Sequence, residues 1–299
     1  MMRRRTHLAW GTVFSVLVPL LAAPAAAQPP VKRLSDINAR LAAMHAPYRL
    51  EKVEWLTDSG QVGQVVFFDD RGNRQSDSHW VPFDPDRGGF GDIATLIDGV
   101  EGATTNGLTE AETTAAIERG LQTWEDVTCS TIPITNFGSF PFDLGVVQFL
   151  TGFGGAFAVL ADVTFAGFLP VAFFDLTFPP SGANVMAGTF TFVFFDGSGN
   201  PTDINNDGKA DTSFRETYFN DAKVWAIDGN IDVETVALHE TGHGLSQEHY
   251  GKLHLTQSNG KFHFSPRAVM NAGYTGVQQV LTGSDNAGHC GIWSGWPNE

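Results

Sequence analysis

The stretch His239–Tyr250 reads HETGHGLSQEHY and places three histidines and two glutamates close together. His239 and His243 are four residues apart, so on a helix their side chains project from one face. Two imidazoles in this arrangement suit zinc, which takes nitrogen ligands in a tetrahedral site. Glu240 is offset by one residue, where its carboxylate could take a proton from a zinc-activated water as that water attacks a carbonyl. The pattern therefore predicts metal-assisted hydrolysis.

A third histidine strengthens this interpretation. His249 lies beyond Gly244, so the chain can turn back after the helix and supply a ligand from outside it. Three histidines leave the fourth zinc position for water, which is the catalytic arrangement and not the closed structural one. The alternative is a solvated helix end that is merely rich in histidine.

Three further segments accompany the motif. HETGHGLSQEH (239–249) resembles the metzincin signature H-E-x-x-H-x-x-G-x-x-H, and SPRAVMNAGY (265–274) resembles the Met-turn. AIERGLQTWEDVT (116–128) is similar to the matrixin helix that precedes the second strand, and ADVTFAGF (161–168) is a weaker echo of a matrixin strand.

The resemblance implies an α/β (α+β) zincin-like fold, in which a twisted mixed sheet carries an active-site helix and a second long helix. It implies a zinc endopeptidase with Glu240 as general base, Met270 as a hydrophobic floor beneath the metal, and a substrate extended along an edge strand.

One position departs from the signature. Ser246 stands where the motif has Gly, whose role is a turn at positive φ. A non-glycine residue in that conformation costs roughly 1–2 kcal/mol, which a fold can absorb. We therefore expect Ser246 to adopt a left-handed turn that lets His249 reach the metal.

Capping and periodicity predict the elements that hold these residues. Asp232 is a good N-cap for a helix over Val233–Gly244. Thr109 and Glu112 form a capping box for a helix within Leu108–Val127. Ile93–Val100 and Thr189–Asp196 read as strands. Leu144–Ala161 is apolar enough to suggest a membrane span, but its glycines favour buried strands joined by turns.

The N-terminus predicts export. Three arginines, an apolar run and the small residues Ala25–Ala27 make a signal peptide over residues 1–27; a retained membrane anchor is the alternative. We expect residues 28–91 to be a propeptide or an integral extension, and residues 92–299 to be the catalytic domain. Residues 28–91 contain no cysteine, so thiol blocking of the zinc is absent.

Composition limits the partners. The net charge is −15, and without the three leader arginines it becomes −18. We expect a secreted or periplasmic protein with this negative charge to bind neither nucleic acid nor anionic membranes. We expect its substrate to be a protein or peptide. Cys129 and Cys290 are the only cysteines. In an oxidising compartment we expect them to pair, and two separate thiols are the alternative.

The segment DINNDGKAD (203–211) predicts a second metal site. Its oxygen donors have the spacing of the first nine positions of an EF-hand-type Ca²⁺ loop, with Gly208 at the bend. Phe214 stands where a bidentate Glu is expected, and Glu216 is a candidate substitute. The candidate calcium ligands are Asp203, Asn205, Asp207 and Asp211; a polar loop between strands is the alternative.

Two other functions compete with the peptidase. One is a catalytically inactive, zinc- or calcium-stabilised exported binding protein, for which Glu240 would be superfluous. The other is a zinc amidase of the deformylase type, which pairs H-E-x-x-H with a cysteine ligand; the third histidine opposes it.

Overall fold

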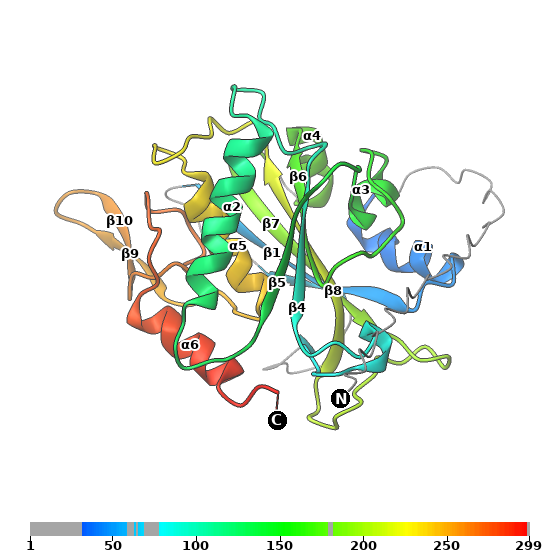
Figure 1. Cartoon of the computed structure of the whole chain (residues 1–299). Helices are drawn as coiled ribbons and strands as arrows, with labels where there is room; N and C mark the ends of the chain where they lie inside the picture. Colours follow the sequence, from blue (N-terminus) through cyan, green and yellow to red (C-terminus); the bar gives the residue numbers. More distant parts are fainter. Residues whose placement is uncertain (1–31, 59–62, 64, 69–77, 179–181, 298–299) are drawn as a thin grey trace, which may run out of the picture.

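A mixed, twisted eight-stranded sheet forms the centre of the molecule (Figure 1). The computed structural model describes residues 32–58, 63, 65–68, 78–178 and 182–297. The predicted leader, residues 1–27, lies outside these ranges. The mixed sheet and the helices packed on it make this a mixed α/β fold, as the sequence predicted.

The sheet has the order β2-β1-β7-β8-β6-β4-β5, and β3 pairs with β8 off this path. Strands β8, β6, β4 and β5 run parallel, whereas β7 is antiparallel to β8 and β1 is antiparallel to both β7 and β2. The bounds are β1 (Tyr48–Thr57), β2 (Val65–Phe67), β3 (Ser78–His79), β4 (Ile93–Asp98), β5 (Ile134–Phe140), β6 (Val163–Leu169), β7 (Val185–Phe194) and β8 (Ala210–Asn220).

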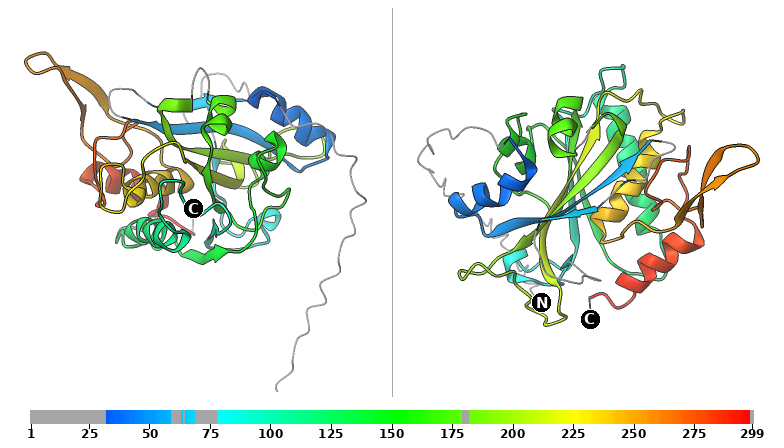
Figure 2. Two further views of the ribbon diagram at one scale, coloured as in Figure 1. Left: turned by 90° about the horizontal axis from the view of Figure 1, so that it is seen from above. Right: turned by 180° about the vertical axis from the view of Figure 1, so that it is seen from behind.

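Helices cover both faces of the sheet (Figure 2), and each face has its own hydrophobic core. α2 (Glu110–Glu125) and α5 (Val233–Gly244) pack on one face. α1 (Ile37–Ala43), α3 (Val146–Thr151) and α4 (Val171–Thr177) pack on the other. Residues on both sides of position 91 thus share one sheet, and removal of residues 28–91 as a propeptide stays a prediction.

The second long helix, α2, begins where its capping box predicts. Thr109 and Glu112 exchange the two hydrogen bonds of the box, and Ala116, Ile117, Leu121 and Trp124 are buried. Gly120 lets α2 approach α5 closely, because a Cβ there would lie 3.0 Å from the backbone nitrogen of Leu238.

The prediction of buried strands over Leu144–Ala161 is wrong. The segment forms the short helix α3 followed by a turn and an irregular stretch. The buried carboxylate of Glu216 in β8 accepts hydrogen bonds from the Val146 and Val147 N–H groups at 2.6 and 3.0 Å. This long-range partner satisfies the first turn of a helix that two β-branched valines would not favour locally. No helix among the described residues is long and apolar enough to cross a membrane.

Helix α6 (Gly283–Trp293) is the last helix of the described residues, and its His289 packs against Trp124 of α2. A disulfide between Cys129 and Cys290 joins α6 to the segment that follows α2, as the sequence led us to expect. Between α5 and α6, the hairpin of β9 (Lys252–Thr256) and β10 (Lys261–Ser265) projects from the body of the molecule (Figures 1 and 2).

One buried histidine lies apart from the predicted metal motif. His289 in α6 is fully buried, with its ring centroid 5.4 Å from that of Trp124. Neither ring nitrogen has a hydrogen-bond partner among the described residues. Burial lowers the pKa of His289 to about 4.

This histidine should make the fold sensitive to acid. Its folded-state pKa lies below its unfolded value, so its neutral form favours folding above about pH 6.5, and that contribution is lost as the pH falls towards 4. Replacing His289→Phe should therefore reduce the loss of unfolding free energy between pH 7.5 and pH 5 by on the order of 1–2 kcal/mol. Urea unfolding at both pH values measures it. The exposed His254→Gln should behave as the wild type, and an unchanged pH dependence in His289→Phe would contradict the assignment.

Candidate metal centre

Helix α5 carries two of the three histidines and is buried along its whole length. It begins after Asp232, whose carboxylate accepts a hydrogen bond of 2.8 Å from the Thr235 N–H, as predicted. Three tryptophan indoles donate to carbonyls of α5 and its C-cap. They are Trp124 to Leu238, Trp80 to Gly244 and Trp293 to Leu245, at 2.8–3.0 Å. These bonds fix the helix between α2, the sheet and α6.

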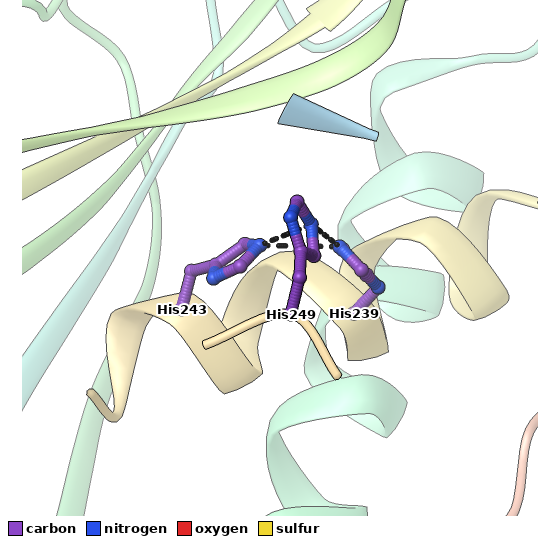
Figure 3. A group of neighbouring side chains, drawn as sticks. All are labelled: His239, His243 and His249. Atoms are coloured by element: carbon purple, nitrogen blue, oxygen red, sulfur yellow. Dashed lines mark hydrogen bonds between the residues drawn. The ribbon is translucent and has the colours of Figure 1, made fainter. Parts of the chain in front are cut away.

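The three predicted histidines meet at one point (Figure 3). Their Nε2 atoms lie 3.1–3.2 Å from one another, although His249 comes from the chain beyond the helix. Among the described residues, the ligand atoms of these three histidines lie close enough together to hold a metal ion.

Backbone carbonyls set the orientation of two of these rings. Nδ1 of His239 lies 2.7 Å from the Val269 oxygen, and Nδ1 of His243 lies 2.8 Å from the Gln247 oxygen. A carbonyl only accepts, so Nδ1 carries the proton in each ring and Nε2 presents its lone pair to the centre of the cluster. Burial lowers the pKa of His239 to about 4, and burial and neighbouring imidazoles hold those of His243 and His249 well below the usual value.

This arrangement fits a metal ion better than it fits three free imidazoles. Lone pairs of neutral rings repel one another at such distances unless a cation lies between them. Two nitrogen ligands of a tetrahedral zinc with Zn–N of about 2.0–2.1 Å lie about 3.3–3.4 Å apart, close to the observed 3.1–3.2 Å. The donor set is therefore compatible with zinc.

The turn after α5 brings His249 to the cluster. Ser246 has φ of 64°, the left-handed conformation predicted for it. Ser246 N–H donates to the His243 carbonyl and Gln247 N–H to the Gly242 carbonyl. These two bonds form a Schellman motif, in which glycine usually occupies the position of Ser246.

The segment around Met270 supports two of the histidines from behind. Met270 is fully buried, and a Cβ added to Gly242 would lie 2.3 Å from its Sδ. The neighbouring Val269 oxygen orients His239, and the Met270 oxygen accepts from the Tyr250 N–H next to His249. Asp285, which the sequence analysis did not identify, accepts hydrogen bonds from the Val269 and Met270 N–H groups at 3.0 and 3.1 Å.

Glu240 is fully buried between α5 and β7. Its Oε2 accepts a hydrogen bond of 2.7 Å from the Thr189 hydroxyl, and its Oε1 has no hydrogen-bond partner among the described residues. Burial raises the pKa of Glu240 to about 8, with a further contribution from the charge of Glu54. A nearby metal ion would lower this pKa.

Two charged residues of β1 also lie at the site, and sequence reasoning missed them. Lys52 Nζ is 3.1 Å from Glu54 and 3.4 Å from Glu248, and Glu54 Oε1 is 3.5 Å from His243 Nδ1. Lys52 and Glu54 are both buried. The signal in the sequence was the alternation of the charged Lys52 and Glu54 with the apolar Val53 and Trp55, which is typical of a strand.

The predicted calcium loop lies between β7 and β8, exposed to solvent for most of its length. Asp203, Asn205 and Asp207 accept hydrogen bonds from N–H groups of the loop itself, and Asp211 accepts from Ile204 N–H. The carboxylates of the described loop do not form a group close enough to be a metal site. Glu216 serves α3 instead, and calcium binding stays a prediction.

A pocket of about 870 Å³ lies between this loop and α6, next to His249. Its walls include Asn205–Asp207, residues 246–250 and the α6 residues Gly288 and Gly291. The loop thus borders the histidine cluster from the side of His249.

No protein-family model and no curated protein matches this chain.

The left-handed Ser246 generates a stability prediction. Ser246→Gly should raise the free energy of unfolding relative to Ser246→Ala by about 1 kcal/mol, because only glycine adopts this φ without strain. Ser246→Ala is the matched comparison, since it also removes the buried hydroxyl, which has no hydrogen-bond partner among the described residues. Urea unfolding measures the difference. Equal stabilities of the two variants would show that the turn is not strained.

Proposed function

We propose that this chain is an exported zinc-dependent endopeptidase with a zincin-like fold, of the metzincin clan and closest to matrixins. The observation that supports this most is the convergence of three Nε2 lone pairs on the helix that also carries the buried Glu240. His239, His243 and His249 would hold the zinc, and a protein or peptide would be the substrate.

The fold supports the assignment to this clan. A twisted mixed sheet with the histidine helix α5 and a second long helix, α2, on one face agrees with the architecture that the motif resemblance implies. Met270 packs against Gly242 on the histidine helix, which suits the hydrophobic floor of the metal site.

The site residues suit acid–base chemistry at a peptide bond. Bound zinc would supply a Lewis acid and lower the pKa of water in the site towards neutrality. Glu240 keeps one carboxylate oxygen fixed by Thr189 and offers the other to take the proton of the attacking water. The same carboxylic acid then gives that proton to the leaving amine. The carbonyls of Val269 and Gln247 keep His239 and His243 in the tautomer that presents Nε2.

The competing functions are less well supported. A merely structural metal site has no need of a buried carboxylate with one unpartnered oxygen, and such a group is costly to retain. A cysteine-ligated amidase needs a thiolate, whereas Cys129 and Cys290 are joined to each other. The disulfide also supports a location in an oxidising compartment, and we propose export by the N-terminal leader.

The proposal predicts separate roles for Glu240 and His249. Glu240→Gln should reduce casein hydrolysis by about 10²–10⁴-fold, the usual contribution of general acid–base catalysis, and should leave one zinc per chain. His249→Ala should lower the zinc content itself, because two imidazoles remain. Activity is assayed as purified and after limited proteolysis, and metal content by elemental analysis.

Glu125→Gln is the matched control, since Glu125 is exposed at the end of α2. It should keep both activity and zinc. Equal activity of Glu240→Gln and wild type, or zinc-loaded wild type without activity in either form, would contradict the peptidase and favour the binding protein.

A further inference from the structure

The metal centre is closed on the side where Glu240 lies. Glu240 and His243 are fully buried, and His239 is 1 % exposed. A carboxylate that acts on an extended peptide must be reachable by that peptide, so some part of the chain occupies the approach.

Strand β1 is that part. It pairs antiparallel with β7 along its whole length, and Glu54 lies opposite Thr189, the residue that holds Glu240. Thr57, which lies opposite Val185 at the first residue of β7, also bridges Gly273 in parallel fashion, and its oxygen accepts a hydrogen bond of 2.8 Å from the Tyr274 N–H. The backbone of β1 is thus bonded to the sheet and then to the segment that follows Met270.

Alternate side chains of β1 lie beside the histidine cluster. Lys52, Glu54 and Leu56 share one face of the strand, because side chains two residues apart do so. Lys52 reaches Glu248, the neighbour of His249, and Glu54 reaches His243. The strand therefore crosses the histidine cluster from its third ligand towards its first.

Leu56 completes this path at His239. It is 2 % exposed and lines a small cavity together with Thr235, His239, Val269 and Tyr274. A buried aliphatic side chain of β1 thus forms part of the wall beside His239.

We propose that β1 fills the peptide groove of this site and keeps the chain latent until residues up to about Thr57 are removed. The edge of β7 that faces away from β8 is the edge that β1 occupies. A strand edge pairs with one partner at a time, so a peptide can pair with β7 only after β1 has left. The ligand class is an extended peptide with an aliphatic residue at the position of Leu56. This inference rests on the proposed function for its consequence, latency, and on the structure for the occupied groove.

The test uses the chain without its leader, in wild-type and Glu240→Gln forms. Each is treated with trypsin and separated by gel filtration in dilute urea, and the N-terminus of the product is sequenced. A fluorescent peptide with the sequence of residues 48–58, YRLEKVEWLTD, is then titrated into the Glu240→Gln form. We expect peptide binding, and casein hydrolysis by the wild type, to rise at least tenfold only in products that have lost β1.

A cross-linked variant is the matched control. Arg49 and Val193 face each other across β1 and β7, so Arg49→Cys with Val193→Cys should hold β1 in place after the cut. This form should stay inactive and fail to bind peptide until it is reduced, with reduced, uncross-linked protein as reference.

The outcomes separate the two proposals. Peptide binding or hydrolysis by the intact or cross-linked chain as strong as that of the released form would overturn the occupied groove. Unfolding on loss of β1, seen as loss of the near-ultraviolet circular dichroism, would also overturn it, because β1 would then be part of the catalytic fold. Peptide binding without casein hydrolysis by the zinc-loaded wild type would support the proposal that β1 occupies the groove and would contradict the proposed peptidase function.

Discussion

The hydrogen bonds from His239 Nδ1 to the Val269 carbonyl and from His243 Nδ1 to the Gln247 carbonyl are the constraint on which the site depends. They decide which nitrogen of each ring carries a proton, and so they direct lone pairs at a common point. The acceptors are themselves held by distant parts of the chain. Val269 N–H donates to Asp285 in the first turn of α6, and α6 is tied by the disulfide to the segment after α2. The two long helices, α6 and the Met270 segment therefore form one frame around the histidines.

The second constraint lies on the sheet side. Thr189 of β7 fixes one oxygen of Glu240, so the position of the carboxylate depends on the register of β7 as much as on α5. The same strand pairs with β1, whose residues Lys52, Glu54 and Leu56 lie beside the histidine cluster. Strand pairing thus places the candidate base and at the same time covers it.

The sequence predicted those features whose causes are local. The capping box at Thr109, the N-cap at Asp232 and the left-handed Ser246 each follow from a few neighbouring residues, and the structure has all three. The convergence of His249 on the other two histidines also followed from a short turn. Features with distant causes were not predictable in this way. The stretch expected to form strands contains α3, whose first turn donates hydrogen bonds to the distant Glu216. Asp285 and the charged pair Lys52 and Glu54 of β1 reach the site only through tertiary packing.

The claim that three histidines form a zinc site is tested most directly by X-ray absorption at the zinc edge, on protein purified without added metal. We expect one zinc per chain, with only nitrogen and oxygen ligands at about 2.0–2.1 Å and the multiple-scattering pattern of three imidazoles. A chain that contains no stoichiometric zinc and takes up none, or one whose zinc has a sulfur ligand, would contradict it.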